Sequence, residues 1–255
     1  MITLPKINPK YEVDKITSFL KKIQKQTGIS KVVLGLSGGI DSTTVYYLLK
    51  KTYKAKNIIS VSLPYKKIKP IIDSFLKGGS IRNFLTLLEP PRSREVQNRK
   101  KFISSPPNQK IRIGNIMARV RMIILFDLAK KNNALVCGTE NKSEKLLGYF
   151  TRFGDSASDI EPISHLYKTQ VYELAKYLRV PEKIIKAKPT AGLWSGQTDE
   201  GEFGFTYKEA DQVLHLYFEK KYNLEKIKKL GFVNAPKIIK RTFNNQFKQQ
   251  TPYHL

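Results

Sequence analysis

The 255-residue sequence has very little cysteine and no long hydrophobic run. Its single cysteine, Cys137, excludes a disulfide within the chain and any metal site built from several thiolates, and we expect it in a buried strand. No apolar stretch approaches the roughly 20 residues of a membrane-spanning helix. The first thirty residues carry scattered charges instead of the apolar core of a signal peptide. We therefore expect a cytoplasmic globular protein that does not associate with membranes.

Acidic residues are scarce as well. The chain has 21 Asp and Glu against 46 Lys and Arg, a formal net charge of +25 at pH 7, and no acid in residues 42–72, 96–126 or 226–255. Such a charge is compatible with nucleic-acid binding, because clustered Lys and Arg neutralise phosphates. The basic residues are mostly Lys spread along the whole chain, however, as on a solvated surface, while "GTENKSE" and "TDEGEF" concentrate the acids. We expect an anionic ligand with a cation partner instead of a nucleic acid.

Strand and helix patterns alternate along the chain. The expected strands are 31–36, 57–63 and 134–138, and the expected helices are 40–51, 114–131, 168–178, 206–219 and 235–247. Thr206 and Glu209 have the spacing of a capping box. The alternation predicts a single α/β domain over residues 1–255, with a parallel sheet, helices on both faces, and ligands at the carboxyl ends of the strands.

Two segments leave their roles open. Residues 65–109 contain Pro pairs and charge, so we expect a partly loop structure there, which we hypothesise covers the site when substrate binds. The helix at 114–131 is apolar over most of its circumference, which indicates burial on more than one side. It either threads the core or packs against another subunit.

The sequence SGGIDS, at residues 37–42, joins the first strand to the following helix. Gly38 and Gly39 allow close backbone approach, and the helix N-terminus supplies free N–H groups for a phosphate. The spacing fits neither the dinucleotide-binding G-x-G-x-x-G pattern nor a Walker A loop. Ser37 and Ser42 can donate to phosphate oxygens, whereas Asp41 can only accept or bind a metal. A carboxylate in a phosphate loop needs a cation beside it, and Mg²⁺ suits it best.

This loop resembles the pyrophosphatase loop of ATP pyrophosphatases, which cleave ATP between the α and β phosphates. Four further motifs follow in order: "GNIMARVRM" (114–122), "GTENKSEKLLGYFTRFGD" (138–155), "EPISHLYKTQVYELAKYL" (161–178) and "KPTAGLWSGQTDEGEFGFTY" (188–207). Together they resemble the ammonia-dependent NAD synthetases from about Val32 to Pro252, with 65–109 the weakest part. The resemblance implies an adenine-nucleotide alpha-hydrolase-like fold. It also implies that ATP adenylylates the nicotinate carboxylate of deamido-NAD, and that ammonia then gives NAD and AMP.

The resemblance assigns roles to individual residues. Asp41 and Lys168 would be catalytic, and Asp41 and Glu144 would hold Mg²⁺, with Glu140 as the competing ligand. ATP, the co-substrate, would contact Gly35, Leu36, Ser37, Gly38, Gly39, Ile40, Asp41, Ser42, Thr139, Lys168 and Thr190. Deamido-NAD would contact Arg119, Arg152, Asp159, Phe247 and Lys248.

Several points stay open beside these roles. Arg119 lies on the apolar helix, where an inward guanidinium needs an anionic partner, either substrate or an ion pair with Asp127 or Glu140. Gly192 stands where relatives usually carry Asp, which puts an acid role in that loop in doubt. The helix at 114–131 is similar to the one that builds the family's dimer interface, which implies a homodimer with a shared substrate site.

Other functions compete with this interpretation. A tRNA-modifying ATP pyrophosphatase would keep the loop and explain the charge, although one strand cysteine is poor equipment for sulfur transfer and the length leaves little room for an RNA-binding portion. A non-catalytic nucleotide-binding or nucleic-acid-binding protein would bind without releasing pyrophosphate. Glutamine-dependent NAD synthetases carry an added amidase portion with a catalytic Cys, for which neither the length nor Cys137 is suited. We therefore expect free ammonia as the nitrogen donor.

Overall fold

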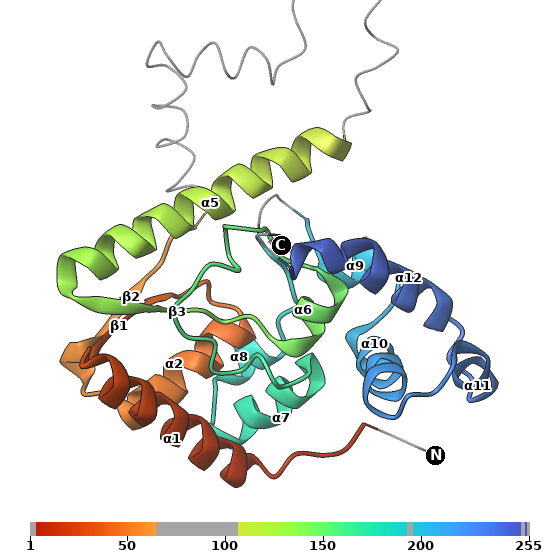
Figure 1. Ribbon diagram of the computed structural model, residues 1–255, viewed down its shortest axis with the longest axis horizontal. Coiled ribbons are helices and arrows are strands. Elements are labelled where there is room, and N and C mark those ends of the chain that lie inside the picture. Colours follow the sequence, from red (N-terminus) through yellow and green to blue (C-terminus); the bar gives the residue numbers. More distant parts are fainter. Residues whose placement is uncertain (1–3, 65–106, 193–195, 251–252, 254–255) are drawn as a thin grey trace, which may run out of the picture.

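The computed structural model describes residues 4–64, 107–192, 196–250 and 253 (Figure 1). Within them a three-stranded parallel sheet has the order β2-β1-β3, formed by β1 (Lys31–Gly35), β2 (Ile58–Val61) and β3 (Ala134–Cys137). Val33 of β1 pairs with Ile59 of β2 and with Val136 of β3. The three expected strands are confirmed. The expectation for residues 65–106 lies outside the described ranges.

Helices cover both faces of this sheet, as expected. The long helix α5 (Pro107–Asn132) packs on β1 and β3 from one side. The opposite side is covered by α2 (Ile40–Thr52), with α1 (Pro9–Thr27) and α7 (Lys168–Tyr177) packed against α2 (Figure 1). The remaining helices are α6 (Lys142–Leu147), α8 (Glu182–Ile185), α9 (Asp199–Phe203), α10 (Tyr207–Leu214), α11 (Leu224–Lys229) and α12 (Ala235–Asn245). None of the described helices is long and apolar enough to cross a membrane.

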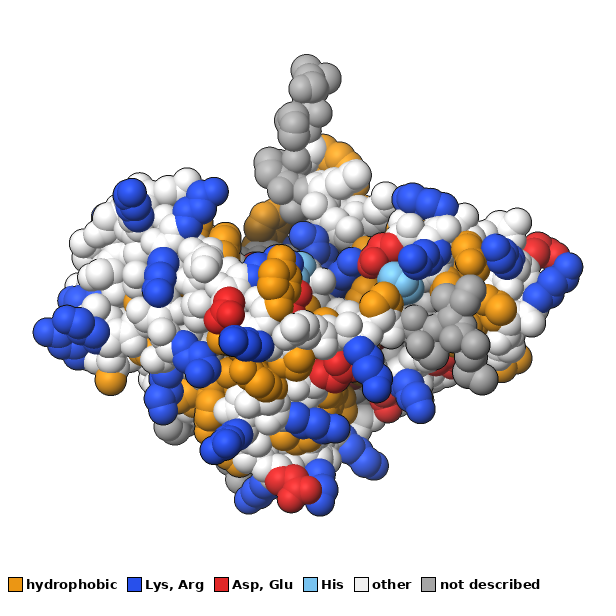
Figure 2. Space-filling view, turned by 90° about the horizontal axis from the view of Figure 1, so that it is seen from below, with side chains coloured by type: hydrophobic (Ala, Val, Ile, Leu, Met, Phe, Trp, Pro, Cys, Tyr) orange, Lys and Arg blue, Asp and Glu red, His pale blue; other side chains and the backbone are white. Residues whose placement is uncertain are grey.

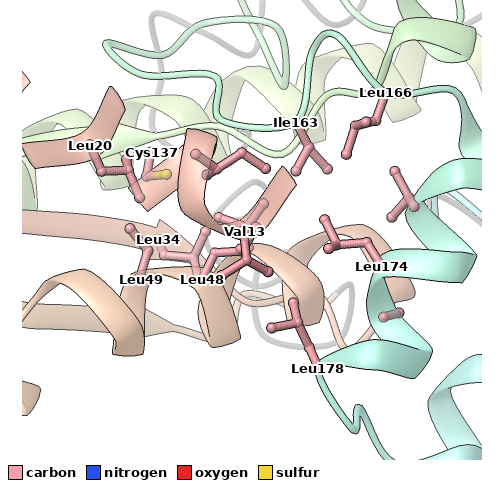
Figure 3. Close-up of a cluster of buried hydrophobic side chains, with 14 of the residues drawn as sticks. Val13, Leu20, Leu34, Leu48, Leu49, Cys137, Ile163, Leu166, Leu174 and Leu178 are labelled. Carbon is pink, nitrogen blue, oxygen red and sulfur yellow. The ribbon is translucent and has the colours of Figure 1, made fainter. Parts of the chain in front are cut away.

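Three hydrophobic clusters hold these layers together. A small one, around Val33, Ala129 and Val136, joins α5 to the sheet. The largest fills the space between the sheet, α1, α2 and α7 (Figure 3), and its buried members include Val13, Leu20, Leu34, Leu48, Leu49, Leu174 and Leu178. Cys137 belongs to this cluster and is 2% exposed, so the expectation of a buried strand cysteine is confirmed. The remaining cluster joins α6, α10 and α12 around Phe203, Tyr207 and Ile238. The last residues of β1 and β3, Gly35 and Cys137, line a cavity at the carboxyl edge of the sheet.

Helix α1 is absent from the expected elements, although its signals are local. Asn8 accepts a hydrogen bond from the backbone N–H of Tyr11, Pro9 takes the first turn, and Gly28 ends the helix in the left-handed conformation. The buried residues Val13, Ile16 and Leu20 mark a single narrow face. Charged or polar residues occupy most of the other positions, so the apolar face is too narrow to stand out in the sequence.

The capping box expected at α10 is only half present. The Thr206 hydroxyl accepts from the Glu209 backbone N–H at 3.2 Å, which caps the helix. The Glu209 carboxylate instead accepts from the backbone N–H and side-chain amide of Asn234, at 3.0 and 2.7 Å. A long-range contact therefore replaces the local one. The helical segment does continue to Glu219, but as a π-helical turn from His215 onward.

Burial of α5 on more than one side is not found among the described residues of the chain. The helix begins at Pro107, seven residues before the expected start, because Pro is compatible with a first helical position. Met117, Ala118 and Ala129 face the protein interior, whereas Ile111, Ile113 and Ile123 are 48%, 44% and 60% exposed. Ile111 lines the cavity described below, whereas Ile113 and Ile123 lie on the outer side of α5 and lack cover within the described ranges.

Candidate active site

The loop at residues 37–42 connects β1 to the N-terminus of α2. Gly38 has a φ of +84°, a conformation that favours glycine, and lets the chain turn sharply there. The Ser37 hydroxyl accepts from the Gly39 backbone N–H at 3.2 Å and lies 2.9 Å from the Ser42 hydroxyl. No described side chain caps α2, and its first residues, Ile40 and Asp41, line the cavity described next, where an anion could accept hydrogen bonds from the free N–H groups.

A cavity of about 920 Å³ opens above this loop. Its wall contains ten of the eleven residues expected to contact ATP, namely Gly35, Leu36, Ser37, Gly38, Gly39, Ile40, Asp41, Thr139, Lys168 and Thr190. Ser42 lies just beneath the wall and is 2% exposed. Residues that are distant in the sequence thus converge on one space at the carboxyl edge of the sheet.

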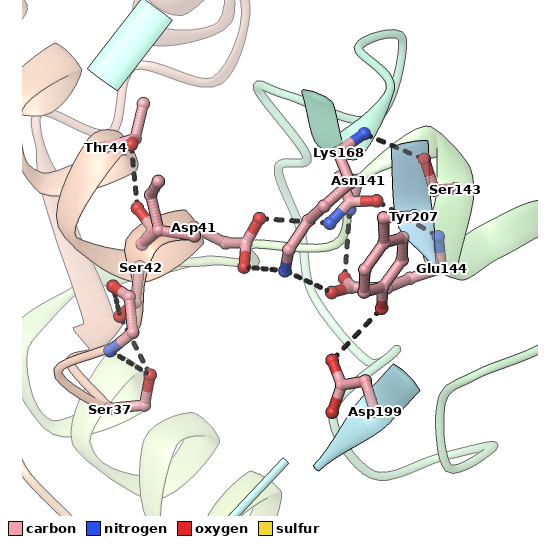
Figure 4. A network of polar contacts seen from close by, with 12 residues as sticks. Ser37, Asp41, Ser42, Thr44, Asn141, Ser143, Glu144, Lys168, Asp199 and Tyr207 are labelled. Carbon is pink, nitrogen blue, oxygen red and sulfur yellow. Dashed lines mark hydrogen bonds and ion pairs between the residues drawn. The ribbon is translucent and has the colours of Figure 1, made fainter. Parts of the chain in front are cut away.

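The Lys168 side chain lies between two carboxylates at the end of the loop (Figure 4). Its Nζ donates to Asp41 Oδ2 at 2.6 Å and to Glu144 Oε1 at 3.0 Å. The other Asp41 oxygen accepts from the Asn141 side-chain amide at 3.0 Å. The ring of Tyr207 lies 5.2 Å from the ammonium, and its hydroxyl donates to Asp199. Both expected metal ligands are therefore brought together on one lysine.

Two helix starts fix this geometry. Asn141 caps α6, because its side chain accepts from the Glu144 backbone N–H while the Glu144 carboxylate reaches back to Asn141. Ser143 of α6 accepts from the Lys168 backbone N–H at 2.8 Å and donates to the buried carboxylate of Asp211. The other Asp211 oxygen accepts from the backbone and hydroxyl of Thr169. Asp211 therefore ties the starts of α6 and α7 together.

Burial and charge set the ionisation of this group. Burial by itself lowers the pKa of Lys168, but the Asp41 and Glu144 carboxylates raise it well above the ordinary value, so the ammonium stays charged. Burial raises the pKa of Glu144 to about 8, against the opposing effect of Lys168. The charges of the network depend on each other.

The donor set of this corner suits a magnesium ion. Asp41 and Glu144 converge on one point and offer hard oxygen ligands, which Mg²⁺ prefers. Across the described ranges, no group of three or more His, Cys, Asp or Glu side chains could hold a metal. Mg²⁺ commonly binds through one or two carboxylates, substrate phosphates and water. The two carboxylates fit that pattern only together with a phosphate ligand.

Glu140, the competing ligand, is placed differently. Its side chain does not line the cavity, and its backbone N–H donates to Glu161 at 3.0 Å. Burial, followed by the negative charge of Glu161, raises the pKa of Glu140 to about 8. Its Oε1 is buried without a hydrogen-bond partner among the described residues. Glu144 is thus the better placed of the two acids.

Four of the five residues expected to contact deamido-NAD lie together. Arg119 Nε donates to the Arg152 carbonyl at 3.2 Å, and the Arg152 guanidinium lies 5.2 Å from the centre of the Phe247 ring. Lys248, next in the chain, lines the cavity and donates to two backbone carbonyls. The other three stand outside the cavity wall. In the described part of the chain, Arg119 forms no ion pair with Asp127 or Glu140.

Asp159 and Gly192 take positions of their own. The Asp159 carboxylate accepts a hydrogen bond from the Val136 backbone N–H at 2.7 Å, so it pairs with a backbone donor of the edge strand β3. Gly192 lines the cavity with a φ of +60° and brings no acid to its loop. The cavity wall also holds residues that the sequence did not single out: Arg121, Tyr149, Asp199, Glu202 and Arg241. Arg121, Tyr149, Asp199 and Glu202 lie within sequence motifs quoted above, which gave them no role, whereas Arg241 lies outside those motifs.

Comparison with known proteins gives a consistent result. A family model described as NAD synthase matches residues 12–252. The chain is 40% identical over 252 residues to the NH(3)-dependent NAD(+) synthetase of Fusobacterium nucleatum, which covers 96% of this chain and 95% of that protein. It is 42% identical over 221 residues to the protein of the same name from Thermococcus kodakarensis, covering 84% of each.

Two solved structures resemble the fold over nearly its whole length. One is the NMN synthetase from Francisella tularensis, with a TM-score of 0.70 and 28% identity over 98% of this chain and 99% of that one. The other is the NH3-dependent NAD synthetase from Campylobacter jejuni in complex with the nitrate ion, with a TM-score of 0.67 and 28% identity over 98% and 100%.

Proposed function

The chain belongs to the NAD synthase family and is an NH3-dependent NAD synthetase, and from this premise we propose which residues perform the reaction. ATP first adenylylates the nicotinate carboxylate of deamido-NAD and releases pyrophosphate, and ammonia then attacks the acyl-adenylate to give NAD and AMP. The observation that carries the assignment of roles is the buried Lys168 ammonium held between Asp41 and Glu144, beside a phosphate loop.

The loop and the start of α2 hold the ATP phosphates in this proposal. Negative charge builds up when a carboxylate approaches the α-phosphate, and fixed donors aimed at that charge lower the barrier. The Ser37 hydroxyl and the uncapped N–H groups of α2 supply such donors, and the buried Ser42 hydroxyl, which donates to the Gly39 carbonyl, supports Ser37 from 2.9 Å. Lys168 moves from its carboxylate partners to the phosphates, and Thr139 and Thr190 also line the cavity. These groups therefore stabilise the pyrophosphate as it departs.

Asp41 and Glu144 are the residues that would hold Mg²⁺. When bound, the ion neutralises charge on the phosphates. A cation there also relieves the repulsion of two carboxylates once Lys168 turns towards ATP. Asn141 keeps Asp41 oriented throughout, because its amide donates to the Asp41 oxygen that Lys168 does not contact.

Deamido-NAD is placed by the cluster of Arg119, Arg152, Phe247 and Lys248, with Asp159 as a neighbouring strand-edge residue in this proposal. Only Lys248 of these reaches the cavity wall, so the cluster borders the site instead of filling it. The exposed isoleucines of α5 support a homodimer in which a second copy covers that helix.

One assay tests the function. Pyrophosphate and NAD are measured with ATP and Mg²⁺ while deamido-NAD, ammonium, glutamine or bulk tRNA are added in turn. We expect pyrophosphate release to need deamido-NAD, and NAD to form with ammonium but not with glutamine. Release that needs tRNA would support the tRNA-modifying alternative and overturn the substrate roles. ATP binding with no turnover under any condition would support a non-catalytic protein.

A further inference from the structure

Arg241 on α12 projects a guanidinium into the cavity wall, and no described carboxylate forms an ion pair with it. The guanidinium lies 4.6 Å from the centre of the Phe203 ring and 5.6 Å from that of Tyr149. Its Nε is buried and has no hydrogen-bond partner among the described residues. A buried donor left unpaired is costly in a folded protein, more so when it is charged. The Nε itself is not accessible from the cavity, but Arg241 lines the cavity, so an anion bound there would stabilise the partly buried charge of the guanidinium.

The acid whose charge acts on Arg241, Glu202, is already engaged in other hydrogen bonds. Glu202 Oε1 accepts from the Tyr149 hydroxyl at 3.1 Å and from the Gln197 amide at 2.7 Å. Its charge acts on Arg241 only from beyond ion-pair distance. The guanidinium therefore keeps its hydrogen-bonding fork for the cavity.

A second cation lies beside Arg241. Lys248 lines the same cavity, and its ammonium donates hydrogen bonds to the backbone carbonyls of Gly148 and Phe150. Burial, and then the charge of Arg241, lowers the pKa of Lys248. Two partly buried cations that repel one another, neither of them ion-paired with a described acid, indicate a place for an anion. Arg suits a phosphate especially, because its planar fork binds two oxygens at once.

This place is separate from the phosphate loop. Lys168 contacts the Tyr207 ring, Tyr207 packs edge-on against Phe203 at 5.5 Å, and Arg241 stacks on Phe203. Two aromatic rings thus lie in series between the two cations. The cavity consequently offers two anion sites, and the ATP phosphates require the one at the loop.

We infer that Arg241, together with Lys248, binds the pyrophosphate of deamido-NAD and favours the dinucleotide over substrates with a single phosphate. The inference rests on the proposed function and adds a residue to it. The reacting nicotinate carboxylate must reach the α-phosphate of ATP near Lys168, so the pyrophosphate is the anionic group left for Arg241. A mononucleotide places only one phosphate beside Arg241, so it gains less binding free energy from the two-pronged guanidinium.

The test replaces the guanidinium and measures both substrates. We expect Arg241→Met to raise the Kd and KM for deamido-NAD by about tenfold to a hundredfold, the usual effect of losing a charged hydrogen bond. The KM for ATP should stay within about twofold, and kcat/KM for nicotinate mononucleotide should fall less than that for deamido-NAD. Binding is measured by calorimetry without ATP, so the result does not depend on turnover. Lys240→Met, which removes an exposed charge from the same helix, should change none of these values.

Arg241→Lys is measured alongside, because it keeps the charge over Phe203 if the truncation impairs folding. It should weaken deamido-NAD binding to an intermediate degree, since the fork is lost. Unchanged Kd for deamido-NAD in both variants would overturn the inference, as would a KM for ATP that rises in step. If the unmodified protein forms no NAD from deamido-NAD, the proposed function itself fails, which is a different result.

Discussion

Lys168 begins α7 at a position where helix electrostatics disfavour a cation, since the positive end of the helix dipole lies there. Asp41 and Glu144 offset that cost at 2.6 and 3.0 Å, and the side chain is buried. Such a costly arrangement is maintained where an anionic substrate uses it. The lysine and its two acids should therefore behave as one unit in mutagenesis.

Lys168→Met should lower kcat by about 100-fold or more, the effect of removing one fixed donor from a developing anion. Steady-state NAD formation at saturating ATP and deamido-NAD measures it. Lys176→Met, at an exposed position on the same helix, is the control and should keep normal activity. Retained activity in Lys168→Met would remove this residue from the catalytic group.

Glu140 gives a pH-dependent prediction. Its folded-state pKa is raised from 4.5 to about 8 by burial and Glu161, so its protonated form stabilises the fold below pH 4.5, and that stability is lost as pH rises towards 8. Glu140→Gln should therefore be more stable than the unmodified protein at pH 8.5, by about 1–3 kcal/mol, and the difference should shrink towards pH 5. Urea unfolding without nucleotide or Mg²⁺ measures it.

The matched control for this prediction is Glu225→Gln, at an exposed site on α11. Its stability should follow that of the unmodified protein at both pH values. A Glu140→Gln variant that is equally destabilised at both pH values would show that the Glu140 carboxylate is satisfied by a partner.

The loop could be predicted from the sequence because its residues are contiguous and each type has a separate chemical reason to be there. Asp211 could not, because its partners Ser143 and Thr169 lie 68 and 42 residues away. Nothing local distinguishes it from a solvated helix acid. Arg241 is hidden in the same way, since its rings come from α9 and the segment after α6.

Among the elements, α6 carries Glu144 and is held at its end by α12. Gly148 closes α6 with a φ of +62°, and a Cβ there would collide with Asn245 of α12. Gly28 closes α1 with a φ of +70° and nothing within 4 Å of such a Cβ. A substitution of Gly28 therefore tests backbone strain alone, whereas a substitution of Gly148 tests backbone strain together with a packing collision.

Gly28→Ala should destabilise the protein by about 1 kcal/mol, from backbone strain alone. Gly148→Ala should cost about 1–3 kcal/mol more, because α6 and α12 must move apart. Urea unfolding of the two variants supplies the comparison. Equal losses would show that the contact between α6 and α12 adapts to the added methyl group.

The three strands and the helices α2, α5, α7, α10 and α12 followed from the sequence because hydrophobic period and flanking Gly or Pro agree there, whereas the 19-residue helix α1 was not predicted. The short helices α8, α9 and α11 were not predicted either, since four to six residues hold too little periodicity to read. At α10 the capping-box pattern correctly predicted the start of the helix. It was wrong about the Glu209 carboxylate, which accepts hydrogen bonds from Asn234 instead of from the N-cap residue.

For the molecule as a whole, the charge and the uncovered side of α5 are the main features. Lys and Arg side chains are scattered over the face shown in Figure 2, with acids between them, instead of forming one stripe. That distribution agrees with a solvated surface on this face. Lys168, Lys248 and Arg241 line the cavity, and in the proposed function these residues supply the attraction for specific anions.

Ile123→Glu should weaken homodimerisation at least about tenfold, because a charge would be buried in an apolar contact. Light scattering coupled to gel filtration over a range of concentrations measures it. Tyr11→Glu, at a 62% exposed position on α1 across the sheet, should leave the dimer intact. A monomeric unmodified protein would contradict the proposed interface outright.

The most direct test of the reaction follows an oxygen atom. Deamido-NAD labelled with oxygen-18 in the nicotinate carboxylate is converted with ATP, Mg²⁺ and ammonium, and the products are analysed by mass spectrometry. If the carboxylate is adenylylated at the loop, one labelled oxygen must appear in AMP and none in pyrophosphate. Label in inorganic phosphate, with ADP as the other product, would mean attack at the γ-phosphate and would contradict the proposed roles of the loop, Lys168 and its two acids.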